Sequence, residues 1–83
     1  MKQELHSTIE YQTSDLGLAA ALLSRAARLE AINREDPRRA VFVFALKPSD
    51  QTVLDDFWNG RLLVDARTYF DSIKTIKSRL YSR

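Results

Sequence analysis

The sequence predicts an α+β fold in which a small antiparallel sheet of about three strands is packed by helices, in the order β-α-β-β-α-α. Three observations carry this prediction. Residues 40–46 are β-branched and aromatic on both faces, which is typical of a central strand. Residues 16–27 are rich in Ala and Leu, the strongest helix formers. Residues 62–81 repeat apolar side chains at helical spacing, with polar residues opposite them.

The first two elements are a strand and a helix. Residues 8–13 alternate polar and apolar side chains, with Ile9 and Tyr11 on one face, as a half-buried strand does. The pair Ser14-Asp15 then offers a side-chain oxygen that can cap the helix that follows.

The middle of the chain is expected to form a hairpin. Residues 28–34 can either continue the first helix or alternate as a strand with Leu29 and Ala31 on the same face. Asp36 and Pro37 mark a turn, because proline fixes its own φ and pushes the preceding residue out of the helical region. The residues alone leave both alternatives open for residues 28–34, and the hairpin with the central strand is the one that we favour.

Two helices are expected to end the chain. The first has Ser49 or Asp50 as its N-cap and Gly60 in its C-terminal cap. The second is expected over residues 62–81, and its apolar stripe includes Phe70.

Length and composition restrict the class of protein. The chain has 83 residues, a formal net charge of +2 and no cysteine. This length allows one core, so we expect a single domain over residues 1–83, with residues 1–7 as a flexible N-terminal arm. Without cysteine the chain has neither disulfides nor a thiolate metal site. No apolar segment is long enough to cross a membrane, and we expect a cytoplasmic protein without a membrane partner.

The motifs of this chain resemble a small domain family of unknown function found in bacteria and their phages. The residues that carry the resemblance are Thr13-Ser-Asp-Leu, Phe57-Trp-Asn-Gly and Val64-Asp-Ala-Arg-Thr-Tyr-Phe. It extends over nearly the whole chain and implies a fold but no catalytic residues. Members often have a glycine near the end of the first helix, where this chain has Ala26-Ala27.

Basic side chains are concentrated toward the end of the chain. Residues 61–83 hold six Lys or Arg against two Asp, a net charge of +4, which leaves −2 for residues 1–60. A second basic cluster brackets the expected hairpin turn. If both clusters face one way, they can bind nucleic-acid phosphates. The alternative without a function is a solvated helix face whose cations are favourably placed near the helix C-terminus. The candidate nucleic-acid-binding residues are Arg34, Arg38, Arg39, Arg67, Lys74, Lys77 and Arg79.

Aromatic side chains bear on the same question, because single-stranded nucleic acid stacks its bases on exposed rings. One face of the central strand, with Phe42 and Phe44 or with Val41 and Val43, can be an exposed stacking platform while the other meets the core, or both faces can be buried. Burial is favoured for Phe42, Phe44, Phe57 and Phe70. Trp58 and Tyr69 are candidate partner-binding residues, because rings at a helix end can anchor a protein partner.

Catalytic residues are not evident in the sequence. The acidic group is Asp50, Asp55, Asp56 and Asp65, whose spacing fits charges at helix starts better than a Mg²⁺ site. The single histidine, His6, lies in the polar N-terminal segment. We therefore expect no enzyme activity, no metal and no cofactor.

Two functions from different classes follow from these patterns. The first is a small, non-enzymatic accessory domain, phage or mobile-element related, that binds DNA or RNA. The alternative is a protein–protein interaction module, a homodimer or a host-factor binder, that uses Trp58, Tyr69 and the edge strand near residues 9–13.

Overall fold

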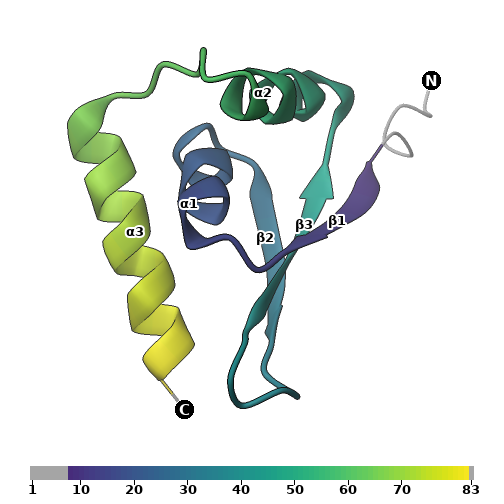
Figure 1. Ribbon diagram of the computed structural model, residues 1–83, viewed down its shortest axis with the longest axis vertical. Helices are drawn as coiled ribbons and strands as arrows, with labels where there is room; N and C mark the ends of the chain where they lie inside the picture. Colours follow the sequence, from purple (N-terminus) through teal and green to yellow (C-terminus); the bar gives the residue numbers. More distant parts are fainter. Residues whose placement is uncertain (1–7, 83) are drawn as a thin grey trace.

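The computed structural model describes residues 8–82. Their elements are β1 (Ile9–Thr13), α1 (Leu16–Ser24), β2 (Arg28–Asn33), β3 (Val41–Leu46), α2 (Pro48–Trp58) and α3 (Ala66–Tyr81). This order confirms the predicted α+β fold, including the hairpin between β2 and β3. The sheet is antiparallel throughout, with strand order β1-β3-β2. Figure 1 shows α1 between α3 and the sheet, with α2 across one end.

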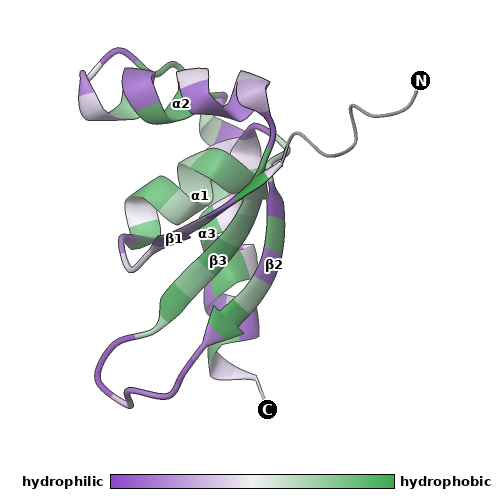
Figure 2. Ribbon diagram, turned by 90° about the vertical axis from the view of Figure 1, so that its right-hand side faces the viewer, coloured by the Kyte–Doolittle hydropathy of each residue, from purple (hydrophilic) through white to green (hydrophobic). Residues whose placement is uncertain are grey.

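The central strand β3 has one fully covered face. Phe42, Phe44 and Leu46 are buried against the helices, which confirms the prediction for the two phenylalanines. Val41 and Val43 lie half-buried on the opposite face. In Figure 2 β3 appears as a hydrophobic strand between β1 and β2. Because both rings are in the core, β3 offers no aromatic platform to a ligand.

The edge strand β2 contains an irregularity that its alternating pattern does not reveal. Its register shifts between Leu29 and Ala31, so that Glu30 is an extra residue with no partner on β3. The expected shared face for Leu29 and Ala31 is therefore wrong, because Leu29 and Ile32 face the core and Ala31 faces away. The Glu30 carboxylate lies 3.0 Å from Nε of Arg28 in an exposed ion pair.

Helix α1 lies at the centre of the molecule. The five consecutive residues from Leu18 to Leu22 are all buried, and five residues cover the full circumference of a helix. Three of them are alanines, which allow the sheet, α2 and α3 to approach closely. The Asp15 carboxylate accepts a hydrogen bond from the Leu18 N–H at 3.0 Å, as the predicted cap requires.

Helices α1 and α2 end in the same way. Ala26 and Gly60 follow their C-caps with φ of +70°, in the left-handed region. The Ala26 N–H donates to the Leu23 carbonyl at 2.9 Å, and the Gly60 N–H donates to the Phe57 carbonyl at 3.1 Å. This is the Schellman arrangement, which normally places glycine at the left-handed position. Gly60 was predicted as a cap residue, whereas α1 uses an alanine there.

Both C-terminal helices begin at residues other than those expected. Pro48 is the first residue of α2, and Asp50, instead of being the N-cap, accepts a hydrogen bond from the Lys47 N–H at 2.8 Å. Proline favours this first helical position because its missing N–H would have no helical partner. Helix α3 begins only at Ala66, because Asp65 caps it. Residues 62–65, predicted as helix, lie outside it.

Candidate nucleic-acid interface

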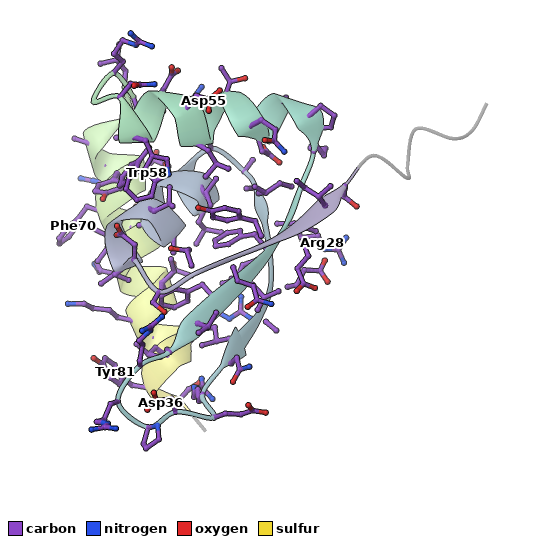
Figure 3. The ribbon with its side chains drawn as sticks, turned by 45° about the vertical axis from the view of Figure 1, so that its right-hand side comes forward. Arg28, Asp36, Asp55, Trp58, Phe70 and Tyr81 are labelled. Atoms are coloured by element: carbon purple, nitrogen blue, oxygen red, sulfur yellow. The ribbon has the colours of Figure 1, made fainter. Side chains whose placement is uncertain are left out.

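Two basic segments far apart in the sequence lie together at one end of the molecule. The connection between β2 and β3 and the last turn of α3 border one open hollow of ≈ 410 Å³. Its lining residues are Arg34, Asp36, Pro37, Arg38, Arg39, Ala40, Leu80 and Tyr81. Figure 3 shows Asp36 of the connection and Tyr81 of α3 at this same end. We call this surface the arginine hollow.

Hydrogen bonds hold the arginine hollow in place. The Arg34 guanidinium donates to the backbone carbonyl of Arg79 in the last turn of α3. Arg39 Nε donates to the hydroxyl of Ser14 at 3.0 Å, which links the connection to the start of α1. The Asp36 carboxylate accepts the N–H of Arg38 at 2.9 Å and closes the turn itself. Arg34 and Arg39 therefore have structural partners, whereas this turn uses only the backbone of Arg38.

The hollow carries excess positive charge that no neighbouring carboxylate neutralises. Around this end of the molecule four arginines, namely Arg34, Arg38 and Arg39 of the hollow and Arg79 beside it, stand against Glu35 and Asp36, a local net charge of +2. Within residues 8–82 the ion pair formed is that of Arg28 with Glu30, on the sheet, so none of the four guanidiniums forms a salt bridge there. An unpaired guanidinium can bind a phosphate with two parallel hydrogen bonds.

Two basic side chains lie between two aromatic ones along one side of α3. Phe70, Lys74, Lys77 and Tyr81 follow the spacing i, i+4, i+7, i+11, so they share one side of the helix, which we call the α3 stripe. All four are exposed, Phe70 by 58% and Tyr81 by 75%. The Lys74 ammonium lies 5.3 Å from the centre of the Phe70 ring. Tyr81 belongs to both surfaces, so the α3 stripe leads into the arginine hollow.

The other predicted basic residues lie at different distances from this end. Arg79 borders a second opening with Ile32 and Arg34, on the β2 side of α3. Arg67 lies in the first turn of α3, about 18 Å along the helix axis from Arg79. The structure thus brings together the three loop arginines and the end of α3, and it leaves Arg67 at the other end of the helix.

The burial prediction is wrong for one of the four phenylalanines. Phe57 is partly buried against the core, but Phe70 is a surface residue. The covered side of α3 is displaced from the expected apolar stripe, because it includes Ser72, whose hydroxyl donates to the Thr68 carbonyl at 2.9 Å, and it leaves Phe70 outside. The exposed positions of Phe70 and Tyr81 are functional candidates that the sequence interpretation missed. Their spacing from Lys74 and Lys77 was the signal that could have found them.

The two predicted partner-binding aromatics differ in environment. Trp58 ends α2 with 62% of its surface exposed, and its ring meets Phe57 edge-on at 5.1 Å. Tyr69 is half-buried, and its hydroxyl donates to the Gly17 carbonyl at 3.2 Å. It also borders a hollow of ≈ 230 Å³ beneath the connection from α2 to α3. Leu63 in that connection is 85% exposed, so the connection and the end of α2 each expose one large apolar side chain.

The acidic residues do not converge. Asp50 is buried beneath the start of α2. Asp65 caps α3, and hydrogen bonds from the N–H and hydroxyl of Thr68, both at 2.9 Å, lower the pKa of its carboxyl group. Within residues 8–82 no three metal-ligating side chains cluster, and none of the helices there has the length and apolarity to span a membrane. His6 and the predicted arm over residues 1–7 lie outside the described residues.

Comparisons with known proteins identify a family. The family model described as domain of unknown function DUF5659 matches residues 8–82, which confirms the resemblance to a domain family of unknown function. Neither the curated proteins nor the solved structures contain a match.

Proposed function

The chain belongs to the DUF5659 domain family, and on that premise we propose that it is a small, non-enzymatic accessory domain that binds DNA or RNA in the cytoplasm. We further propose that it is phage or mobile-element related, as the resemblance implies. The observation that carries the binding proposal is the arginine hollow, where two basic segments 40 residues apart in the chain meet beside an exposed tyrosine.

The arginine hollow suits phosphate for two reasons. Its arginines form no salt bridge within residues 8–82, so phosphate binding does not first have to break one. The connection that carries them is tied to α3 by Arg34 and to the start of α1 by Arg39, which fixes these two guanidiniums before the ligand arrives. Prior ordering of the side chains reduces the entropy lost on binding. Lys74 and Lys77 extend the positive charge along α3.

Binding can be tested by fluorescence anisotropy with labelled DNA and RNA at several salt concentrations. Replacing both Arg38 and Lys77 by Ala removes two cations of this surface without touching the hydrogen bonds that hold it. We expect weaker binding. We also expect the binding constant to fall less steeply with salt concentration, by the amount that corresponds to the loss of roughly two phosphate contacts. The matched control replaces Arg28 and Arg61 by Ala, which changes the net charge equally at exposed positions elsewhere. Equal losses in both double variants, or no binding by the parent protein, would contradict the proposal.

A protein-interaction module is the second candidate, because exposed apolar side chains also occur away from the basic end. Trp58 and Leu63 lie at the surface near the connection from α2 to α3, and Ile9 on edge strand β1 is 51% exposed. Large exposed apolar side chains, tryptophan above all, are the residues that most often anchor a protein partner. Light scattering over a concentration series tests the homodimer form. A dimer that dissociates when Trp58 is replaced by Ala supports the homodimer. A monomer at every concentration excludes the homodimer and leaves only an interaction with a different protein.

A further inference from the structure

The α3 stripe places large aromatic rings on the solvent side of an amphipathic helix, where polar side chains are usual. The apolar side of α3 packs on α1 through Tyr69, Ile73 and Ile76. Phe70 and Tyr81 are nevertheless large rings that contribute more than half of their surface to solvent. Neither ring is needed to complete the core, and each has a lysine one turn away along the helix.

The geometry of the α3 stripe matches the two parts of a nucleotide strand. Aromatic rings offer flat faces to bases, and the neighbouring ammonium groups offer charge to phosphates. The rings are 11 residues apart, which separates them by about 16 Å along the helix. Lys74 lies over one face of the Phe70 ring as a cation–π partner, and 58% of the Phe70 surface is exposed to solvent.

Building on the proposed function, we propose that the ligand of this surface is single-stranded nucleic acid, with bases stacked on Phe70 and Tyr81. Its phosphates run along Lys74 and Lys77 toward the arginine hollow. The stacking platform is therefore a helix side and not the sheet, whose phenylalanines are buried.

A duplex cannot use the rings in this way. Its bases are stacked on one another, so exposed rings contribute nothing unless a base is first unstacked, which costs free energy. A duplex would contact only the cations, whereas a single strand contacts the cations and the rings. The α3 stripe should consequently favour single strands, and that preference should depend on the rings.

The test compares a labelled oligothymidylate of about 12 nucleotides with a duplex of the same length, by anisotropy at one salt concentration. We expect tighter binding of the single strand. The variants Phe70→Leu and Tyr81→Leu keep an apolar side chain but remove the ring, and each should weaken single-strand binding roughly tenfold while duplex binding is unchanged. The control Trp58→Leu removes an exposed ring off the stripe and should bind as the parent protein does.

The outcomes separate this inference from the proposed function. Equal affinity for duplex and single strand, or ring variants that bind like the parent, overturn the single-strand assignment while leaving nucleic-acid binding in place. Loss of binding on Trp58→Leu also overturns it, by moving the contact to α2. No binding of either probe overturns both. Circular dichroism melts of all three variants check that these exposed substitutions leave the fold intact.

Discussion

Exchanging Ala26 and Gly60 for one another tests the structure of the helix ends. Both residues have φ of +70° in the same hydrogen-bonded arrangement, after α1 and α2 respectively. We expect Ala26→Gly to stabilise the protein and Gly60→Ala to destabilise it. The two changes are mirror images of each other, so each controls for the other.

The magnitude follows from two opposing effects. An L-residue in the left-handed region is strained by about 1–2 kcal/mol, which glycine relieves. Glycine in turn loses more backbone entropy on folding, by about 0.4–1 kcal/mol. The balance is about 0.7 kcal/mol in favour of glycine at position 26. Its methyl group is exposed, so removing it leaves no cavity. At position 60 an added Cβ meets no atom within 4 Å, so the cost there is backbone strain alone.

Thermal and urea unfolding monitored by circular dichroism measure both changes. For a domain of this size, about 0.7 kcal/mol raises the Tm of Ala26→Gly by about 3–6 °C and lowers that of Gly60→Ala by a similar amount. A lower Tm for Ala26→Gly, or an unchanged Tm for Gly60→Ala, would refute the left-handed geometry at that helix end.

Three further predictions concern the core, a buried hydroxyl and a helix cap. Ile76 is fully buried, so Ile76→Val should lower the free energy of unfolding by about 1 kcal/mol in urea titrations, whereas Leu63→Ala at an exposed site should change it by less than about 0.5 kcal/mol. Tyr69→Phe removes the hydrogen bond to the Gly17 carbonyl and should cost about 1 kcal/mol by the same assay, and no change would argue against that bond. The lowered pKa of Asp65 means that its capping contribution is complete above the unfolded pKa of about 4 and is lost as the pH falls below it. Asp65→Asn should therefore lower the Tm at neutral pH, and its difference from the parent should narrow in acid. A difference that is constant with pH would contradict this account of the cap.

The element order was largely predictable because the helices and strands other than β2 have their own local patterns, whereas residues 28–34 fit a helix as well as a strand. The central strand is apolar on both faces, and the Asp36-Pro37 turn separates it from β2. The bulge at Glu30 was not predictable, because an extra residue in a strand leaves the composition unchanged and only the pairing reveals it. The start of α3 was misplaced because apolar residues continue ahead of Asp65, whose capping role decides the boundary.

The candidate site was predictable in its residue types but not in its assembly. The arginines of the β2–β3 connection and the basic end of α3 are visible in the sequence. Their meeting depends on how α3 packs across α1, which no local pattern encodes. The exposure of Phe70 likewise depends on the width of the helix side that α1 covers. Helical periodicity places Phe70 at the margin of that side and leaves its burial undecided.

Nuclear magnetic resonance titration tests the central claim of a nucleic-acid surface most directly. In two-dimensional ¹H–¹⁵N spectra of the labelled protein, adding a short single-stranded oligonucleotide should shift the amides of residues 34–40 and of the α3 stripe, and the shifts should diminish as salt is added. Shifts confined to the surroundings of Trp58 and Leu63, or an unchanged spectrum at excess oligonucleotide, would contradict it.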